Sequence, residues 1–428
     1  MPVRSLTEAL PATWTRGEIS VLGLARSGRA AAELLRRAGA DVYASDAGTG
    51  DAVAHAGAAR DAGVPVVGEL EVALHFLPHQ RYVAITGTNG KTTTTAIAHR
   101  LLQGLGYDAV AAGNIGTPLA EVALRERAPD WIALETSSFQ LHDAPSIAPT
   151  VGILTNLSAN HLDRYADVEA YFADKAHLFR NANDRSVWVS NADDPEVQQM
   201  VQGVRGTHLR FTTGPGVADG YFDRARVQLV VLGSPLIDRH DLVLLGDHNV
   251  ANALAAALAV MGVDEAHRTD DARARVADAL RRFRALEHRI EPAGRYGDVE
   301  WINDSKSTNV ASTLVALKGM QRPTVLLLGG RHKGEPYGAL SDELRRTVKL
   351  VVAYGEAAPL VEEDLSGVVP VARLGSSFDE VLARARAGAA PGDAVLLSPA
   401  CSSYDMFDNY EERGRAFKRI AAELGAAP

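Results

Sequence analysis

The chain has 428 residues, of which 46% are hydrophobic and 23% are charged, an ordinary composition for globular domains with several cores. At roughly 150 residues a domain, this length predicts about three domains. Lysine and arginine number 44 against 53 aspartates and glutamates, which gives a net charge of −9. We expect no nucleic-acid partner, because such surfaces are normally basic. The composition excludes a disordered tail protein and a collagen-like fibre, and one cysteine excludes an intramolecular disulfide scaffold.

Neither a secretory signal nor a membrane anchor is expected. The first twelve residues carry Arg4 and Glu8 and have no apolar run of the kind found in secretory signals. The most apolar helical segment, residues 250–261, is too short to cross a bilayer. The sequence therefore predicts a cytoplasmic protein that has no membrane partner.

The first domain is expected over residues 1–79, where predicted strands and helices alternate. An apolar run from Ile19 precedes a predicted helix over 30–38, a second strand over 41–46 and a third over 64–67. This order predicts a parallel sheet with right-handed crossovers.

The second domain is expected over residues 80–286. Its main predicted strands cover residues 81–86, 130–135, 151–155 and 186–190. Two additional strands, in an antiparallel arrangement, are predicted over 227–231 and 242–245 on either side of a Gly-Ser-Pro turn. Helices over 249–260 and up to residue 283 close this domain.

The third domain is expected over residues 287–428. Its predicted strands cover residues 301–304, 324–328, 350–353, 369–372 and 394–397. The whole chain is thus predicted to be an α/β protein of three domains, each built on a mainly parallel sheet. Several strands end in glycine or a polar residue, and open α/β sheets bind ligands at the carboxyl ends of their strands.

The segment Gly-Thr-Asn-Gly-Lys-Thr over residues 87–92 follows a predicted strand and opens a predicted helix over 92–102. A phosphate-binding loop needs this context, because backbone N–H groups and the helix N-terminus converge on phosphate oxygens. Lys91 would reach the outer phosphates, and the Thr92 hydroxyl can hold Mg²⁺. The segment lacks the earlier glycine of the strict pattern, so we predict a variant loop, with a plain glycine-rich turn as the alternative.

A second glycine-rich turn, residues 23–28, has the pattern G-x-A-x-x-G and is followed about 20 residues later by Asp46. By itself this pattern leaves three readings open: a nicotinamide site, another nucleotide site and a tight turn.

Glu135 ends a predicted strand, His161 and Asp163 lie in a polar loop, and Lys175 lies on a predicted helix. A carboxylate and an imidazole near a phosphate-binding threonine suggest Mg²⁺ binding and charge neutralisation on a polyphosphate. The local sequence also allows His161 to be a hydrogen-bonded loop histidine and Lys175 to be a solvated lysine.

A third polar strand end, residues 303–309, combines Asp304 and Lys306 with hydroxyl side chains. This set is typical of an anionic-substrate or nucleotide site, and a capped helix start is the alternative. Cys401 has no evident His and Asp partners, so we expect a packed residue and not a nucleophile.

These motifs, taken together and in order, resemble the Mur ligase family, which makes the peptide of bacterial peptidoglycan. The segments that carry the resemblance are Gly87–Thr92, Gly113–Gly116, Glu135–Leu141, His161–Tyr165, Gly246–Asn249, His288–Arg289, Asp304–Asn309 and Ser398–Ser403. Within the family, Asp304-Ser-Lys with Thr308-Asn309 is most similar to the branch that adds D-glutamate. The resemblance implies a Rossmann-like first domain, a P-loop ATPase-like central domain and a Rossmann-like last domain.

The implied reaction is the ATP-dependent addition of D-glutamate to UDP-N-acetylmuramoyl-L-alanine through an acyl phosphate, by a cytoplasmic monomer. Another ligase of the family and a folylpolyglutamate synthase-like ligase are the enzyme alternatives. A nucleotide-binding regulator and a nicotinamide oxidoreductase are alternatives from other classes, and neither explains the whole set of motifs.

The resemblance also implies roles for individual residues. The catalytic residues would be Lys91, His161 and Lys175. ATP would be bound by Gly87, Thr88, Asn89, Gly90, Lys91, Thr92, Thr93, Asn252, Arg289, Asp304 and Lys306. The sugar nucleotide would be bound by Arg26, Ser27, Asp46, Ala47 and Asn114. D-glutamate would be bound by Thr308, Lys333, Ser403, Tyr404 and Tyr410. Two Mg²⁺ ions would be held by Thr92, Glu135, His161 and Lys175, the last as a carbamate.

Two departures from the family pattern affect these roles. Residues 46–48 are Asp-Ala-Gly where the family often has a hydroxyl and an arginine, which leaves the uracil contacts open. Tyr410 stands where phenylalanine is common, and this change should be tolerated.

Overall fold

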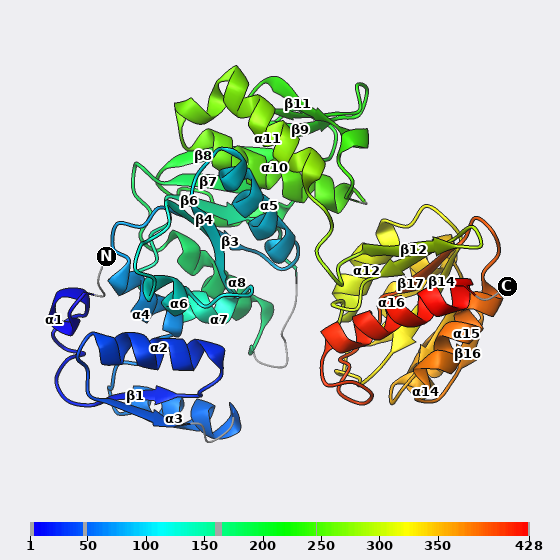
Figure 1. The fold of residues 1–428 in the computed structure, drawn as a ribbon, viewed down its shortest axis with the longest axis horizontal. Coiled ribbons are helices and arrows are strands. Elements are labelled where there is room, and N and C mark those ends of the chain that lie inside the picture. Colours follow the sequence, from blue (N-terminus) through cyan, green and yellow to red (C-terminus); the bar gives the residue numbers. More distant parts are fainter. Residues whose placement is uncertain (1–3, 46–48, 159–164, 245, 427–428) are drawn as a thin grey trace. The chain divides into compact units, whose positions relative to one another are not determined.

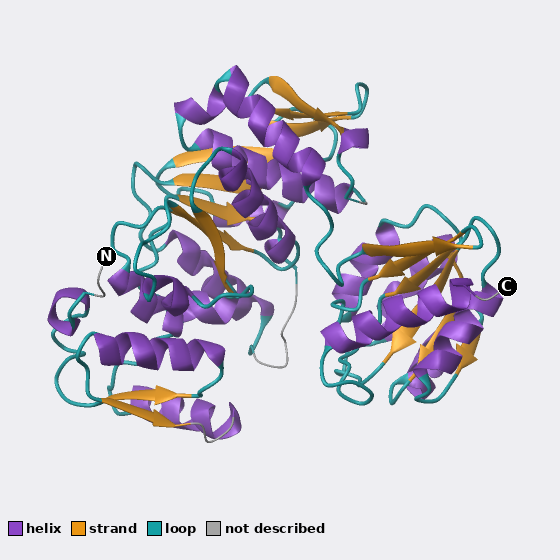
Figure 2. Ribbon diagram, viewed as in Figure 1, coloured by secondary structure: helices purple, strands orange, loops and turns teal. Residues whose placement is uncertain are grey.

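The computed structural model describes residues 4–45, 49–158, 165–244 and 246–426, which alternate helices and strands (Figures 1 and 2). Three sheets of two, nine and six strands are present in these ranges. Most strand pairs are parallel, so the predicted α/β class with mainly parallel sheets is confirmed. The chain forms two compact units, Met1–Leu242 with Val250–Phe283 and Val243–Asn249 with Arg284–Pro428. The two smaller sheets are divided between these units, and the large sheet lies in the first.

The two-stranded sheet pairs β1 (Ile19–Leu22) in parallel with β2 (Val42–Ser45), and α2 (Arg26–Arg37) connects them. Leu34 and Leu35 of α2 are buried because they lie on its apolar stripe. The predicted third strand over 64–67 is wrong, since this segment has no strand pairing. Pro65 has no N–H to donate to a ladder and Val64 is 54% exposed.

The nine-stranded sheet has the order β11-β10-β9-β8-β7-β6-β3-β5-β4. Its strands are β3 (Tyr82–Thr86), β4 (Ala109–Gly113), β5 (Trp131–Glu135), β6 (Val151–Leu154), β7 (Val187–Asn191), β8 (Thr207–Thr212), β9 (Gly220–Asp223), β10 (Gln228–Val231) and β11 (Ser234–Asp238). Every residue of β3, β5 and β6 is buried, as expected for parallel strands that are covered on both faces. The carboxyl ends of these three neighbouring strands therefore lie together at one edge.

The edge of this sheet is an antiparallel hairpin of β10 and β11. The strand predicted over 227–231 is confirmed, but the one predicted over 242–245 is wrong, because described residues 242–244 are not a strand. Leu232 and Gly233 both have positive φ angles, 51° and 76°. Such a two-residue turn matches the twist of a hairpin and returns the chain at once, so the partner strand begins at Ser234.

The six-stranded sheet of the second unit has the order β12-β13-β17-β14-β15-β16, with only the β12–β13 pair antiparallel. Its strands are β12 (Glu291–Tyr296), β13 (Val299–Asn303), β14 (Thr324–Gly329), β15 (Val348–Tyr354), β16 (Val371–Arg373) and β17 (Ala394–Leu397). Along β14, Leu326 and Leu328 join one buried cluster while Val325 and Leu327 join another. This alternation shows that both faces of the sheet are packed.

The helices cover these sheets (Figure 2). The α-helices that accompany the sheets of the first unit are α1 (Leu6–Ala9), α3 (Thr49–Asp61), α4 (Glu69–Phe76), α5 (Lys91–Gly104), α6 (Leu119–Ala123), α7 (Ser138–His142), α8 (Val168–Ala176), α9 (Pro195–Met200), α10 (Asp247–Gly262) and α11 (Asp270–Arg282). The second unit adds α12 (Val310–Lys318), α13 (Ser341–Thr347), α14 (Ala358–Leu365), α15 (Phe378–Gly388) and α16 (Tyr410–Ala426). The 3-10 turns are η1 (His177–Phe179), η2 (Arg239–Asp241), η3 (Glu265–Arg268) and η4 (Tyr337–Leu340).

In the described ranges, none of the helices combines the length and the apolar character needed to cross a membrane. The apolar segment of α10 is buried in the protein, as its residues from Val250 to Met261 show.

Gly152 of β6 lies where a side chain has no room, because a Cβ there would collide with the indole of Trp188. We expect Gly152→Ala to lower the free energy of unfolding by about 1–3 kcal/mol, as overpacking of a filled core usually does. Urea unfolding followed by tryptophan fluorescence measures this loss. Gly57→Ala in α3 is the control, since a Cβ at that helical position meets nothing within 4 Å. A loss that is equal in both variants would contradict the packing argument.

Candidate active site

The loop between β3 and α5 is shaped by two glycines with positive φ angles, Gly87 at 138° and Gly90 at 81°. A Cβ on Gly87 would collide with Thr155 Oγ1, and a Cβ on Gly90 would collide with the Asn252 side chain. Both positions therefore require glycine for their backbone conformation and for lack of space. The loop leads directly into the N-terminus of α5, as the predicted phosphate-binding loop requires.

The exit of β6 fixes this loop through hydrogen bonds. Thr88 N donates to Asn156 O at 2.8 Å, and Asn89 N donates to Asn156 Oδ1 at 2.9 Å. Thr155 Oγ1 and Asn156 Nδ2 both donate to Asn89 O, at 2.7 and 3.0 Å. The polar residues at the end of β6 thus hold the loop in one conformation.

Lys91 begins α5 and turns back over the loop. Its Nζ donates to Gly87 O at 3.0 Å and to Thr88 O at 2.9 Å. Asn252 of α10 lies beside Gly90 and accepts a hydrogen bond from Thr94 Oγ1 at 3.2 Å. Lys91 and Asn252, which were predicted as parts of one ATP site, therefore both lie at the loop.

Glu135 ends β5 and is buried at this edge of the sheet. Its Oε1 accepts a hydrogen bond from Asn114 Nδ2 at 3.0 Å. Its Oε2 is also buried, and no hydrogen-bond partner for it is found among the described residues. A buried carboxylate oxygen that lacks a donor is costly, and a divalent cation is one group that would compensate it.

Lys175 lies on α8, is only 1% exposed, and donates from Nζ to Gly87 O at 2.9 Å. Its Nζ also lies 4.5 Å from the centre of the Tyr171 ring. Burial, reinforced by the charge of Lys91 and opposed by that of Asp174, lowers the pKa of Lys175 well below its ordinary value. The alternative that Lys175 is a solvated helix lysine is therefore wrong.

The predicted sugar-nucleotide residues are only partly described. Asp46 and Ala47 lie outside the described residues, as does His161 of the predicted metal set. Arg26, which opens α2 just before Ser27, donates to Gly116 O at 2.6 Å and forms an ion pair with Glu121 at 2.7 Å. Arg26 is thereby brought to the segment that also carries Asn114.

In the second unit, Asp304 follows β13 and is buried. Its carboxylate accepts hydrogen bonds from Ser398 Oγ at 2.7 Å and from Ile290 N at 3.2 Å. Burial raises the pKa of Asp304 to about 6, although these hydrogen bonds and the Arg289 charge oppose the rise. Lys306 Nζ lies 5.3 Å from the centre of the Tyr410 ring, so these two predicted ligand-binding residues are neighbours.

Some of the residues predicted to bind the amino acid are neighbours within the second unit. Lys333 Nζ donates to Thr308 Oγ1 at 3.2 Å, while Ser403 is buried and Tyr404 is 65% exposed. An isolated bridge between Arg331 and Ser402 joins the two loops that carry these residues.

Arg413 of α16 was missed by sequence reasoning. Its guanidinium is fully buried and donates to Ser305 O at 2.8 Å and to Cys401 O at 3.2 Å. It therefore ties the segment of Lys306 to that of Ser403. The one feature of the sequence that could have indicated its buried position is that this charged residue falls on the apolar stripe of the last helix. Cys401 is a packed residue as expected, and burial raises the pKa of its thiol to about 11.

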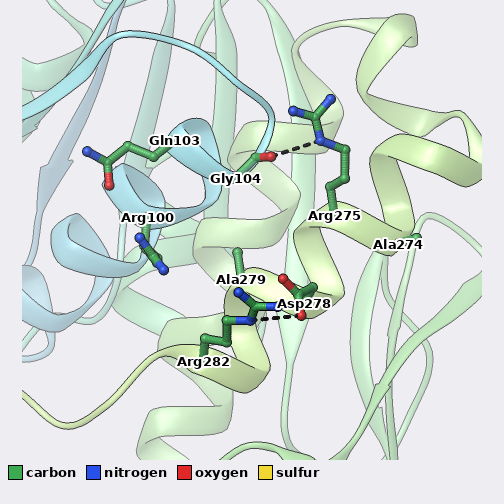
Figure 3. Close-up of a pocket in the computed structure, with 8 residues that line it drawn as sticks. All are labelled: Arg100, Gln103, Gly104, Ala274, Arg275, Asp278, Ala279 and Arg282. Carbon is green, nitrogen blue, oxygen red and sulfur yellow. Dashed lines mark hydrogen bonds and ion pairs between the residues drawn. The ribbon is translucent and has the colours of Figure 1, made fainter.

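A cavity of about 470 Å³ lies elsewhere, between α5 and α11 (Figure 3). It is lined by Arg100, Gln103, Gly104, Ala274, Arg275, Asp278, Ala279 and Arg282. Arg275 donates to Gly104 O at 2.9 Å and Arg282 pairs with Asp278 at 3.1 Å. Lys91 begins α5 and Gly104 ends it. At a rise of 1.5 Å a residue, the Gly104 end of the cavity is therefore roughly 20 Å from the glycine loop.

The glycine loop at a helix N-terminus, with a buried carboxylate and a buried lysine at the same sheet edge, defines a nucleotide-phosphate-binding α/β protein. Residues 85–260 match the Mur ligase middle domain, and residues 288–401 match the Mur ligase glutamate ligase domain. The chain belongs to the Mur ligase family.

Close relatives cover nearly the whole chain. A UDP-N-acetylmuramoylalanine–D-glutamate ligase of Salinibacter ruber is 38% identical, over 96% of this chain and 98% of its own length. The protein of the same name from Pelotomaculum thermopropionicum is 34% identical, over 96% of this chain and 98% of its own.

Solved structures share the fold. A MurF ligase from Thermotoga maritima in complex with ADP has a TM-score of 0.64 at 16% identity. The match covers 97% of this chain and 100% of the chain of that ligase. A UDP-N-acetylmuramate-alanine ligase from the same organism has a TM-score of 0.61 at 17% identity, covering 95% of this chain and 99% of its own.

The raised pKa of Asp304 makes stability depend on pH. Between its ordinary value of 3.8 and about 6, the folded state binds more protons than the unfolded state. We therefore expect wild type, compared with Asp304→Asn, to lose on the order of 3 kcal/mol of unfolding free energy as pH rises through this window. Urea unfolding at a series of pH values measures the difference. Asp342→Asn is the control because this side chain is 100% exposed; parallel curves for wild type and Asp304→Asn would contradict the burial argument.

Proposed function

We propose that the chain is an ATP-dependent ligase that joins D-glutamate to UDP-N-acetylmuramoyl-L-alanine through an acyl phosphate. The observation that carries this proposal is the meeting of Lys91 and Lys175 at the glycine loop, with the buried Glu135 on the neighbouring strand. The shared name of the relatives supports the choice of substrates. The site as a whole combines phosphate binding with ligands for a hard cation.

The loop supplies positioning and charge for phosphoryl transfer. Backbone N–H groups at the start of α5 bind phosphate oxygens and carry the positive end of the helix dipole. Lys91 exchanges its two backbone carbonyl acceptors for the outer phosphates of ATP, and this offsets negative charge as the γ-phosphoryl group moves. Asn252 supports the loop from α10 at Gly90.

The residues present suit Mg²⁺. Glu135 offers a buried oxygen with no described hydrogen-bond partner, Thr92 offers a hydroxyl at the start of α5, and His161 and a carbamate on Lys175 complete the proposed two-ion set. Bound Mg²⁺ would supply charge neutralisation on the phosphates. Mg²⁺ prefers oxygen ligands, and the carboxylate, hydroxyl and carbamate groups of this set provide them.

Carbamate formation on Lys175 requires a neutral amine. The lowered pKa of Lys175 increases the fraction of this form. The Nζ lone pair attacks the carbon of CO₂, a C–N bond forms, and one proton leaves to solvent. The product is an anionic oxygen ligand in place of an ammonium group, which also removes the repulsion from Lys91.

The chemistry follows from the poor reactivity of a carboxylate. One oxygen of the L-alanyl carboxylate attacks the γ-phosphorus, the bond to the bridging oxygen of ADP breaks, and an acyl phosphate forms. The D-glutamate amine then attacks the acyl carbon, and the tetrahedral adduct loses phosphate. The amine proton goes to a base, and the products are an amide, ADP and orthophosphate.

The remaining residues are proposed to select the substrates. Arg26, Ser27, Asp46, Ala47 and Asn114 bind the sugar nucleotide. Arg289, Asp304 and Lys306 contact ATP from the second unit. Thr308, Lys333, Ser403, Tyr404 and Tyr410 surround D-glutamate. The three predicted domains, 1–79, 80–286 and 287–428, divide this work, and we propose that the protein acts as a cytoplasmic monomer without membrane or nucleic-acid partners.

Isotope transfer tests the reaction directly. With ¹⁸O in the substrate carboxylate, we expect one labelled oxygen in the released orthophosphate for each amide formed, because the acyl phosphate passes that oxygen to phosphorus. Mass spectrometry of the phosphate measures it. Release of unlabelled phosphate during amide formation would overturn the proposed intermediate.

Two controls set the specificity of this assay. L-glutamate and other amino acids in place of D-glutamate should give little product, and a clear preference for another amino acid would favour a different ligase of the family. Lys91→Ala should lower the rate by several orders of magnitude, at about 1.4 kcal/mol of lost transition-state stabilisation for each tenfold.

A carbamate on Lys175 predicts chemical rescue. Lys175→Ala should be nearly inactive, and short carboxylic acids such as acetate should restore part of the rate because they supply the missing oxygen ligand. The rate as a function of added acid measures this rescue. Lys91→Ala treated in the same way is the matched control and should show none. Full wild-type activity after CO₂ depletion, together with absence of rescue, would show that Lys175 acts as an ordinary lysine.

A further inference from the structure

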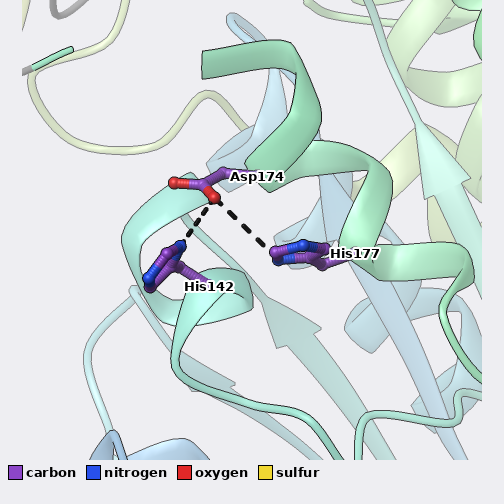
Figure 4. Close-up of side chains that lie close together, drawn as sticks. All are labelled: His142, Asp174 and His177. Carbon is purple, nitrogen blue, oxygen red and sulfur yellow. Dashed lines mark hydrogen bonds and ion pairs between the residues drawn. The ribbon is translucent and has the colours of Figure 1, made fainter. Parts of the chain in front are cut away.

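Three side chains outside the proposed catalytic set converge where α7, α8 and η1 meet. His142 ends α7, Asp174 lies on α8, and His177 opens η1. Figure 4 shows all three pointing toward one another. One nitrogen or oxygen of each lies within 4.8 Å of the others, so one ion could contact all three.

We propose that His142, Asp174 and His177 form a binding site for a transition-metal ion of the Zn²⁺ class. Two imidazoles and one carboxylate suit zinc, which accepts nitrogen and oxygen ligands, whereas Mg²⁺ and Ca²⁺ take mainly oxygen. Three protein ligands with a further position open to water is a common zinc arrangement. This proposal does not depend on the ligase reaction.

An unsatisfied nitrogen supports the site. His177 Nδ1 is buried, and the described residues provide no hydrogen-bond partner for it. This atom lies 3.9 Å from Asp174 Oδ1. Buried polar atoms without partners are rare in folded proteins, and a bound ion is one group that explains them. A metal ion between Nδ1 and the carboxylate would satisfy the nitrogen.

The separations of the ligand atoms fit a small adjustment around an ion. Zn–N bonds of about 2.0–2.1 Å place neighbouring ligands of a tetrahedron roughly 3.3 Å apart. His142 Nδ1 now lies 2.7 Å from Asp174 Oδ1, and the corresponding His177 distance is 3.9 Å. The first contact would open by about 0.6 Å and the second would close by about 0.6 Å.

The surroundings have the other features of a metal site. Tyr165 donates from its hydroxyl to Asp174 Oδ2 at 2.9 Å, which leaves Oδ1 directed at the two histidines. Hydrogen bonds of this kind orient a metal-binding carboxylate. The His142 side chain is 52% exposed, so an ion can reach it from solvent.

The site is separate from the proposed Mg²⁺ set. Lys175 follows Asp174 directly, but its amine reaches Gly87 O at the glycine loop. Successive residues of a helix point about 100° apart, and Asp174 reaches His142 of α7 instead. Zinc bound there would link α7 to the end of α8.

Zinc titration of the full-length protein in excess MgCl₂ tests the site, after removal of metals with a chelator. We expect one Zn²⁺ to bind tightly by isothermal titration calorimetry. His142→Ala and Asp174→Asn should each weaken that affinity at least tenfold. Tyr165→Phe, which removes only the orienting hydroxyl, should weaken it by about 10–100-fold. Zinc should raise the melting temperature of wild type more than that of these variants.

The exposed His240 provides the control, and His240→Ala should bind zinc like wild type. Circular dichroism without metal checks that each variant is folded. If His142→Ala does not fold, Asp174→Asn provides the test of zinc affinity. X-ray absorption at the zinc edge should show two imidazoles, a signature that a hydrogen-bonded cluster would not give. No tight binding, or equal binding in wild type and all folded site variants, would overturn the proposal.

Discussion

The candidate active site depends on one backbone carbonyl. Gly87 O accepts hydrogen bonds from both Lys91 and Lys175, at 3.0 and 2.9 Å, so two lysine side chains from different helices converge on one acceptor. Burial and the charge of Lys91 then lower the pKa of Lys175. The Lys91 ammonium and the positive end of the helix dipole at the N-terminus of α5 together favour a polyanionic ligand. The glycine at position 87 is essential because a side chain would collide with Thr155.

The strands and their polar ends could be predicted because they are continuous apolar runs followed by glycine or a charged residue. The β3 strand and its loop are the clearest case. The strands β4, β8, β9, β11 and β12 were not predicted. Of these, β4 is rich in alanine and β12 contains Pro292 and Gly294, so neither has the β-branched pattern that signals a strand.

The partners of the site residues could not be read from the sequence, since they join distant segments. Arg413 lies 108 positions from Ser305, whose oxygens it contacts. In the sequence, Arg413 cannot be distinguished from the other arginines of an amphipathic helix. Likewise, the place of Lys175 at the loop depends on how α8 packs, and local spacing carries no information about that packing. The hairpin at β10 shows the same limit, because a leucine at a positive φ angle is an unusual turn residue.

The environment of Cys401 has a practical consequence. The thiol is buried and lies 2.9 Å from the Tyr337 hydroxyl, and its raised pKa keeps it protonated at neutral pH. It should therefore react slowly with maleimides and other alkylating dyes. Since no other cysteine occurs in the chain, a cysteine introduced on the surface would be labelled almost alone, without removal of the native thiol.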